Sequence, residues 1–193
     1  MDVKFDSKGN MYVLCRDERK VYKYPKSNFN NASKQTFVHL PDTKGGLYSM
    51  DFDANDNLII GAEKDGFYVV NPNGNATKFA GNGDGNTDGI AGQLLTAQLI
   101  QPVAIVVDKT RGDIYFTDSY NHKVRRIRPG AKGNEDATVS TIAGTVGGKQ
   151  DGDGSVAQLN MPHGLAMSPD GNTLYFTDLD NFILRKITIT VKD

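Results

Sequence analysis

The hydrophobic residues of this chain are grouped in short runs rather than spaced at helical intervals. The runs are four to seven residues long, they are rich in Val, Ile, Tyr and Phe, and clusters of Gly, Asn and Asp separate them. Short β-branched and aromatic runs bounded by such clusters are typical of strands joined by turns. The pattern therefore predicts an all-β chain.

Three short polar segments join a first strand to a second strand. They lie at 5–10, 52–57 and 167–172, and each contains Asp with Asn or Gly. Gly and Asn tolerate positive φ, and an Asp or Ser side chain stabilises a turn by accepting hydrogen bonds from its backbone. The sequence predicts a tight antiparallel connection at each of these places.

The strand pattern is repeated along the chain. Residues 113–118, DIYFTD, recur as TLYFTD at 173–178, and the match continues on both sides at the same offset of 60 residues. Weaker copies lie in the first half. The aligned second strands begin at Met11, Leu58, Ile114 and Leu174. Their spacings of 47, 56 and 60 residues mean that four repeats account for the whole chain.

Each repeat is predicted to form a four-stranded antiparallel sheet. The four units are expected at 1–40, 41–80, 81–143 and 144–193, in a single repeat region. In the third unit the expected strands are 103–108, 114–118, 123–128 and 138–143. One such sheet does not bury both of its faces, so the copies have to pack on one another. A β-propeller is the arrangement that repeats of about 40–50 residues favour. A β-sandwich is the alternative, but it does not require so regular a repeat.

The two stronger units resemble NHL repeats. Their pattern is Thr-Ile-Ala-Gly, a Gly/Asp-rich loop, Ala-Gln-Leu-x-x-Pro-x-Gly-Leu-Ala, Leu-Tyr-Phe-Thr-Asp and Asn-x-x-x-Arg-Lys-Ile. It is clearest at 141–187 and nearly as clear at 79–127. The resemblance implies a propeller, usually of six blades, that serves as a binding platform. Related propellers include lyases, gluconolactonases and strictosidine-synthase-like enzymes.

The number of repeats departs from the six blades that the resemblance implies. With four units we expect a partial propeller, a fragment of the six-bladed type, rather than a closed ring. The alternative is a closed four-bladed ring in which the stretch 188–191 pairs beside the N-terminal strand.

The charge balance argues against nucleic acid and membrane surfaces as partners. The chain has 22 Lys and Arg against 23 Asp and Glu, and its net charge is −1. Such a balance provides no attraction to a phosphate backbone or an anionic membrane. The basic residues Lys123, Arg125, Arg126, Arg128 and Lys132 form one cluster, but neighbours along a strand point to opposite faces. No apolar run approaches the ~18 residues of a membrane span, so we expect no membrane insertion.

Neither the cysteine nor the N-terminus identifies a compartment. Cys15, the single cysteine, lies in the apolar run 11–15 and is expected to be a small core residue. The first residues lack the charged and then apolar layout of a signal peptide. If the protein is exported, we expect that its signal peptide lay upstream and was removed. The Asn and Gly turns, together with the exported bacterial members of the NHL-repeat family, favour an extracellular, cell-surface or periplasmic bacterial protein.

His163 is the titratable residue of greatest interest. It stands at the start of a first strand, and the first strands of a propeller line its central channel. Tyr48 and Val103 occupy the equivalent positions in other units. We expect Tyr48, Val103 and His163, with Asp51 and the loops 82–93 and 147–156, to form the ligand-binding surface.

The glycine-rich loops are candidates for calcium. The segments 82–89 and 150–154 offer oxygen ligands on a flexible backbone, but neither completes a calcium loop with a terminal Glu. We expect no cofactor, with calcium as the alternative. A zinc site built from histidines is not expected, because His39 and His122 share no register with His163.

Two acidic and two basic residues recur with the repeat. Asp118 and Asp178 stand at one register, which favours a structural role in each blade. We expect each carboxylate to accept backbone N–H groups of the following turn. Arg125 and Arg185 are expected to pair with aspartates or turn carbonyls.

The sequence contains no serine nucleophile elbow, no Cys/His pairing and no HExxH segment. We therefore expect a non-catalytic binding or scaffold module rather than an enzyme, one that presents loops on a rigid frame to a protein, peptide or carbohydrate. The local resemblance around Pro162 to gluconolactonases implies the alternative, a metal-dependent hydrolase or lyase that uses His163.

Overall fold

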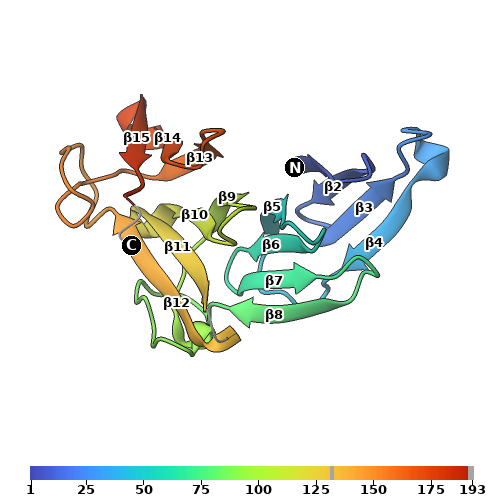
Figure 1. Cartoon of the computed structure of the whole chain (residues 1–193), viewed down its shortest axis with the longest axis horizontal. Coiled ribbons are helices and arrows are strands. Elements are labelled where there is room, and N and C mark those ends of the chain that lie inside the picture. The colour runs from blue at the N-terminus through green and yellow to red at the C-terminus, as the bar shows by residue number, and fades with distance from the viewer. Residues whose placement is uncertain (131–132, 191–193) are drawn as a thin grey trace.

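The chain folds into four antiparallel β-sheets that lie side by side along an open arc (Figure 1). The structure, a computed structural model, describes residues 1–130 and 133–190. Three of the sheets have four strands and the last has three. In each sheet the strands follow chain order from the inner side of the arc to its outer side, so neighbouring strands are antiparallel throughout.

The strands of the first two sheets are β1 (Asp2–Phe5), β2 (Met11–Cys15), β3 (Lys20–Tyr24), β4 (Gln35–His39), β5 (Leu47–Phe52), β6 (Leu58–Ala62), β7 (Gly66–Val70) and β8 (Ala76–Ala80). The third and fourth sheets comprise β9 (Pro102–Val107), β10 (Ile114–Asp118), β11 (Lys123–Gly130), β12 (Gly133–Ala143), β13 (Pro162–Met167), β14 (Thr173–Asp178) and β15 (Ile183–Thr188). Short 3₁₀ helices are η1 (Asn31–Ser33), η2 (Leu94–Thr96), η3 (Ser119–Asn121) and η4 (Leu179–Asn181). None of the helices in the described part of the chain has the length and apolar character that a membrane crossing needs.

The first strand of each sheet lies on the inside of the arc, in the order β1, β5, β9 and β13 (Figure 1). Side chains of one inner strand bind the backbone of its neighbour. The Met50 N–H donates to the Asp2 carboxylate at 2.9 Å, and the Ile105 N–H donates to the Ser49 hydroxyl at 2.9 Å. Backbone groups that have no partner within their own sheet thus find one in the next sheet.

Apolar side chains fill the space between neighbouring sheets and form three core clusters. Between the first and second sheets, the rings of Tyr12 and Phe52 meet edge to face with their centroids 5.0 Å apart. Between the second and third sheets, the rings of Phe67 and Phe116 meet in the same way at 4.7 Å. The second and third sheets therefore each pack against a neighbour on both faces, which explains the apolar residues on both sides of their strands.

Aspartate side chains stabilise the polar turns between first and second strands. The Asp6 carboxylate accepts the N–H groups of Lys8 and Asn10 at 3.0 and 2.8 Å. Asp53 accepts two N–H groups in the equivalent turn, each at 2.8 Å. These contacts satisfy backbone groups that face away from any strand, as the sequence predicts.

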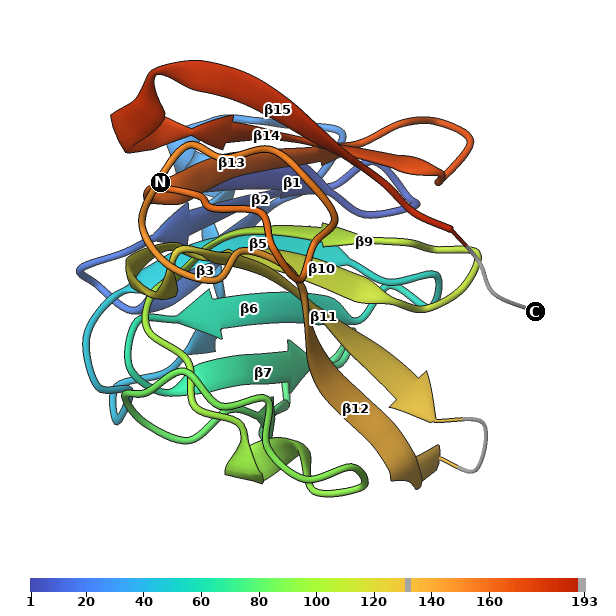
Figure 2. The same ribbon diagram turned by 90° about the vertical axis from the view of Figure 1, so that its left-hand side faces the viewer.

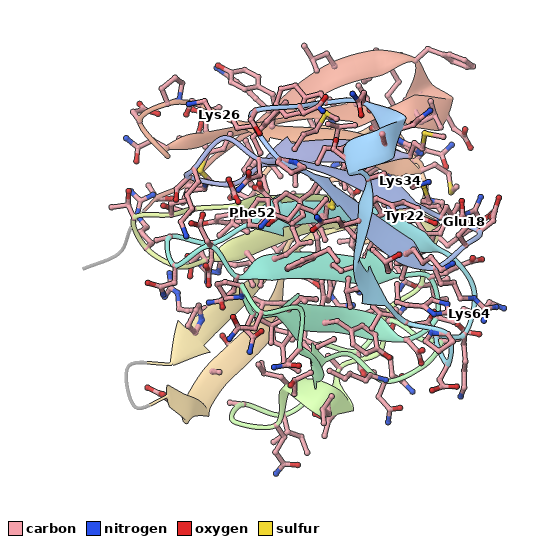
Figure 3. The ribbon with its side chains drawn as sticks, turned by 90° about the vertical axis from the view of Figure 1, so that its right-hand side faces the viewer. Glu18, Tyr22, Lys26, Lys34, Phe52 and Lys64 are labelled. Carbon is pink, nitrogen blue, oxygen red and sulfur yellow. The ribbon has the colours of Figure 1, made fainter. Side chains whose placement is uncertain are left out.

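Polar side chains from β3, from the turn before it and from the residue after η1 gather beside the first sheet, as Figure 3 shows for Glu18, Tyr22 and Lys34. The Lys34 ammonium lies 3.6 Å from the centroid of the Tyr22 ring. The Tyr22 hydroxyl donates to the Glu18 carboxylate, and this hydrogen bond raises the pKa of Tyr22 to about 12. A stacked cation and a charged acceptor together hold the ring against the sheet.

The prediction of an all-β partial propeller is confirmed, and the closed ring is not formed. Within the described residues, β1 pairs only with β2, and residues 188–190 have no pairing with β1. Val191, the end of the stretch expected to close the ring, lies outside the described residues.

The first and last sheets each leave an apolar face uncovered in the described structure. Phe5 is exposed, whereas Phe52 at the equivalent position of the second sheet is buried. Leu184 is exposed, whereas its equivalent Val124 is buried. Cys15 belongs to the same uncovered face of the first sheet and is half-buried rather than part of the core. The expectation for Cys15 was wrong because no neighbouring sheet covers that face.

We expect Phe116→Ala to lower the free energy of unfolding by about 3–5 kcal/mol, because truncating a fully buried ring leaves a cavity between two sheets. Urea denaturation followed by circular dichroism measures the change. Phe182→Ala is the control. Phe182 is 92% exposed, so its truncation is expected to change the free energy by less than about 0.5 kcal/mol. Equal losses in the two variants would contradict the packing described.

Candidate functional site

A pocket of about 500 Å³, which we call the central hollow, opens on the inner side of the arc, where the inner strands meet. Its lining includes Tyr48 from β5, Val103 from β9 and His163 from β13. These residues come from three different sheets, and each stands near the start of its inner strand. The arc thus brings together three of the residues that the sequence singles out.

Arg16 brings a positive charge to the hollow and holds Tyr48. Its guanidinium carbon lies 4.3 Å from the centroid of the Tyr48 ring, and its Nη2 donates to the Tyr48 hydroxyl at 2.5 Å. The Glu63 carboxylate lies 3.4 Å from the same nitrogen. The side-chain amide of Gln101 also donates to the Tyr48 hydroxyl. A stacked cation and two donors therefore fix the orientation of this ring.

Lys4 and His163 add further nitrogen groups to the lining. The Lys4 ammonium lies 3.8 Å from the Asp51 carboxylate. The His163 residue is exposed, and its backbone carbonyl accepts the Thr117 hydroxyl at 2.8 Å, which joins β13 to the third sheet. Lys4, Arg16 and His163 can donate hydrogen bonds to a carboxylate or hydroxyl group placed in the hollow.

Asp51 does not line this hollow. One carboxylate oxygen accepts the Val107 N–H at 2.9 Å, and the other lies 3.8 Å from the Lys4 ammonium. Asp51 therefore links β5 to β9 and positions Lys4. Asp51 thus contributes to the contact between the inner strands β5 and β9.

A buried guanidinium fastens the glycine-rich loop that precedes β9. The Arg125 Nη1 donates to the Asp118 carboxylate at 2.8 Å and to the Gln98 carbonyl at 2.7 Å. Its Nη2 donates to the Thr87 carbonyl at 2.6 Å and to the Asp88 carboxylate at 2.8 Å. Arg125 and Asp118 are fully buried. The planar fork of arginine suits this set of four acceptors, which we call the arginine clamp.

The arginine clamp recurs in the fourth sheet. The Arg185 Nη1 donates to the Asp178 carboxylate at 2.9 Å and to the Gln158 carbonyl at 2.5 Å. Its Nη2 donates to the Gln150 carbonyl at 3.0 Å and to the Asp151 carboxylate at 2.6 Å. The prediction that these arginines pair with aspartates and turn carbonyls is confirmed.

Asp118 and Asp178 serve the structure, but their partners differ from those predicted. We expected N–H groups of the following turn. Asp118 instead accepts the N–H of Ile100, 18 residues earlier in the chain, at 2.8 Å, and the side-chain amide of Asn121 at 2.8 Å. Asp178 accepts the N–H of Asn160 at 2.6 Å. In each of these sheets, the loop that precedes the first strand folds back beside the second strand. The N–H groups of that loop have no partner in a strand ladder, so they need an acceptor.

The two carboxylates of the third sheet's clamp have opposite pKa shifts. Burial raises the pKa of Asp118 above its ordinary value, and the charge of Arg125 opposes that shift. Burial also acts to raise the pKa of Asp88, but hydrogen bonds from Thr141 and the charge of Arg125 bring that pKa below its ordinary value. Loss of Arg125 would therefore leave Asp118 in a dry site without a counter-charge.

One acidic side chain of each glycine-rich loop is bound by these arginines. Asp88 lies in the loop 82–93 and Asp151 in the loop 147–156. Across residues 1–130 and 133–190, no three His, Cys, Asp or Glu side chains gather as a metal ion would require. His39 lies in β4, and His122 follows η3, where its Nδ1 accepts the Met161 N–H at 3.3 Å. Calcium in these loops stays a prediction.

The basic residues of β11 do not form one surface. Arg125 is buried in the clamp, whereas Arg126 and Arg128 lie 3.6 and 3.4 Å from the Asp113 carboxylate. The cluster is divided between the two faces of the strand, as predicted. Lys132, the last member of the predicted cluster, lies outside the described residues.

Sequence reasoning missed Arg16 and Lys4 in the lining of the hollow. Both belong to the first unit, where the repeat pattern is weakest. Arg16 stands in a turn with three other charged residues, at 17–19, and no pattern distinguishes it from its neighbours. Its contact with Tyr48 spans 32 residues of chain and depends on how the two sheets sit against each other.

Two curated relatives match a little over half of this chain. The protein SUPPRESSOR OF QUENCHING 1, chloroplastic, of Arabidopsis thaliana is 37% identical over 106 residues, which are 54% of this chain and 9% of that protein. NHL repeat-containing protein 2 of Homo sapiens is 30% identical over 110 residues, 56% of this chain and 14% of that protein. The chain spans only a small part of these relatives. No family model matches it.

Solved structures share the fold over almost the whole chain. A Bacteroides thetaiotaomicron protein of unknown function superposes with a TM-score of 0.78 at 18% identity, covering 97% of this chain and 46% of that one. An auxiliary nutrient binding protein of the same bacterium has a TM-score of 0.72 at 19% identity, covering 96% and 46%. A gluconolactonase of Xanthomonas campestris has a TM-score of 0.65 at 17% identity, covering 96% and 56%. The chain is therefore about half as long as these structures.

These comparisons confirm the resemblance to NHL-repeat propellers. The repeat pattern has a physical basis in the arginine clamp. Its Asp, the Asn three residues later and the Arg seven residues later are Asp118, Asn121 and Arg125, which meet around one buried carboxylate.

We expect Arg125→Met to lower the free energy of unfolding by about 3–5 kcal/mol, because it leaves a buried carboxylate without its partner. Arg185→Met is the matched comparison. It also leaves a buried carboxylate, Asp178, without its partner, but it is expected to cost less because the Arg185 side chain is 9% exposed and the Asp151 side chain 91% exposed, so water is closer to this clamp. Lys109→Met serves as a surface control, because Lys109 is exposed in the turn after β9. Urea denaturation of the three variants measures these differences. An Arg125→Met variant as stable as the control would show that the clamp contributes nothing.

Proposed function

We propose that this NHL-repeat propeller region is a non-catalytic binding module, and that the central hollow receives part of a protein, peptide or carbohydrate ligand. The observation that carries the proposal is the meeting of Tyr48, Val103 and His163, from three separate sheets, around one hollow of about 500 Å³. Its size is within the range of about 300–1,000 Å³ that ligand sites occupy. A rigid frame with polar groups converging on an open volume is suited to binding.

The chemistry of the lining favours a ligand that carries a carboxylate. Arg16 and Lys4 each form an ion pair within the protein, with Glu63 and Asp51. The hollow is also lined by Asp2, whose carboxylate oxygens accept the N–H groups of Val3 and Met50. The Arg16 side chain is nevertheless 45% exposed, and the Lys4 side chain is 32% exposed, so both can bind a further anion. Exposed His163 supplies another donor at the same rim. A sugar acid or an acidic side chain of a peptide would complement these groups.

The relatives in structure support this choice in broad terms. One of them is an auxiliary nutrient binding protein of a Bacteroides species. By analogy, we propose a location at the cell surface or in the periplasm for this chain. Neither membrane insertion nor nucleic-acid binding is part of the proposal, because the net charge is −1 and the basic cluster is divided.

Glycan and acidic-peptide arrays would identify a ligand, and calorimetry would then measure its Kd. We expect Arg16→Ala to weaken binding about 10-fold or more, because a hydrogen bond to a charged group contributes about 1.5–3 kcal/mol. His163→Ala is expected to weaken binding about 3–10-fold. Lys109→Ala is the control, since Lys109 is exposed in the turn that follows the other end of β9. A ligand that binds all three variants as tightly as the wild type does not occupy the hollow.

The alternative function is a metal-dependent hydrolase or lyase that uses His163. The similarity of fold to a gluconolactonase supports this alternative. Elemental analysis of the undialysed protein and of His163→Ala distinguishes the two functions. We expect no stoichiometric metal that depends on His163. One equivalent of metal that disappears in His163→Ala would overturn the binding module, whereas calcium that persists in the variant would belong to the loops 82–89 or 150–154.

A further inference from the structure

The chain contains two Asn-Gly dipeptides, and the structure places them in different surroundings. Asn73 and Gly74 lie in the turn between β7 and β8, whereas Asn82 and Gly83 lie in the glycine-rich loop that follows β8. Figure 2 shows that loop, drawn in green, outside the sheets. Both asparagines are exposed. Asparagine is a chemically labile residue, and a following glycine has no Cβ to keep the asparagine side chain away from its nitrogen.

The reaction open to such a dipeptide is deamidation through a cyclic imide. The glycine nitrogen gives its proton to hydroxide and forms a bond to the side-chain carbon Cγ of the asparagine. The bond between Cγ and Nδ2 then breaks, and the side-chain nitrogen takes a proton from water and leaves as ammonia. A second water molecule opens the ring at one of its two carbonyls, so the product is either aspartate or isoaspartate. Solvent supplies every reactant, and nothing is oxidised or reduced.

The first dipeptide is held in a form that resists this reaction. The Gly74 N–H donates to the Asn71 carbonyl at 2.9 Å and so closes the turn. The Asn71 side chain accepts the N–H groups of Asn73 and Asn75, each at 3.0 Å. A Cβ added to Gly74 would lie 2.6 Å from the Phe37 carbonyl oxygen, so the glycine is also confined by β4. Its nitrogen can attack the Asn73 side chain only after the turn opens.

The second dipeptide lacks these restraints. Within the described residues, the Gly83 N–H donates no hydrogen bond and the Asn82 side chain has no hydrogen-bond partner. A Cβ added to Gly83 would meet no atom within 4 Å, so the space around this glycine is open. The nitrogen that attacks and the side chain that it attacks are therefore both free in the folded protein.

We propose that Asn82 is a site of spontaneous covalent modification, at which the folded protein closes a cyclic imide with Gly83 and ends as aspartate or isoaspartate. Asn73 stays intact for as long as its turn is closed. The proposal goes beyond the binding function of the central hollow, because neither Asn82 nor Gly83 lines that hollow.

The isoaspartate product loosens the loop next to the arginine clamp. The Asn82 N–H donates to the Ala97 carbonyl at 2.7 Å, and the Gly83 carbonyl accepts the Leu99 N–H at 3.2 Å. Isoaspartate adds a methylene group to the main chain between these two hydrogen bonds, so the two can no longer form together at their present spacing. The residue between Ala97 and Leu99 carries the carbonyl that accepts from the Arg125 Nη1. The modification thus weakens the attachment of the loop to the third sheet.

Peptide mapping by mass spectrometry follows both sites in one digest. Trypsin releases Asn73 in the peptide 65–78 and Asn82 in the peptide 79–109, where fragment ions distinguish it from Asn86. The chain is incubated at neutral pH, folded in one sample and unfolded in guanidinium chloride in the other. In the unfolded sample we expect similar rates at the two sites, because both are Asn-Gly. In the folded sample we expect Asn82 to react about fivefold faster than Asn73 or more, because at Asn73 a backbone hydrogen bond has to break first.

Two variants test the role of the local structure at each site. Asn82→Ser removes the reactive side chain, so deamidation at that position is expected to disappear while the rate at Asn73 is unchanged. Asn71→Ala removes the side chain that braces the turn. It is expected to raise the rate at Asn73 about 2–10-fold and to leave the rate at Asn82 unchanged.

Urea denaturation tests the effect of the modification on the loop. Asn82→Asp carries the charge of the product on an ordinary main chain, so its urea midpoint is expected to match that of the fresh protein. The isoaspartate fraction of the aged protein, separated by ion exchange, is expected to unfold at a lower urea concentration.

Three results would overturn the proposal. One is a rate at Asn82 in the folded protein that is no higher than the rate at Asn73. Another is deamidation of Asn82 in guanidinium chloride but not in the folded protein, which would show that the fold protects this site as well. The third is an isoaspartate fraction with the same urea midpoint as Asn82→Asp, which would remove the effect on the loop.

Discussion

A four-stranded sheet with apolar side chains on both faces is stable in water only where neighbouring sheets cover those faces. Here the faces cover one another in sequence, through contacts such as Tyr12 with Phe52 and Phe67 with Phe116. Stacking sheets in this way forces their first strands together on the inside of the arc. The central hollow follows from that arrangement, because the starts of the inner strands converge without filling the space between them.

The two connections that lead into the third and fourth sheets are long and rich in glycine, so packing alone does not hold them in place. Arg125 holds the first of these loops by donating hydrogen bonds to its carbonyl groups, and Arg185 holds the second loop in the same way. Burying a guanidinium is costly unless its charge is paired and its donors are hydrogen-bonded. The aspartates and loop carbonyls accept from both terminal nitrogens of Arg125, whereas its Nε has no hydrogen-bond partner within the described residues. The clamp thereby converts two flexible loops into parts of the frame that supports the inner strands.

The central hollow presents side chains, so it suits a ligand recognised by its charge and hydroxyl groups. Tyr48 illustrates this, because Arg16 and Gln101 hold its ring in place before any ligand arrives.

The sequence by itself determined the strands, the tight turns, the repeat and the propeller, because each depends on residues close together or at a fixed offset. It also placed Tyr48, Val103 and His163 at one register, which proved sufficient to bring them to one hollow. Only the tertiary structure decided that Arg16 and Lys4 join them, that Asp51 binds the backbone of β9 instead, and that Asp118 accepts from Ile100. Those contacts join segments whose separation is set by how sheets twist and stack, and no local pattern along the chain records that geometry.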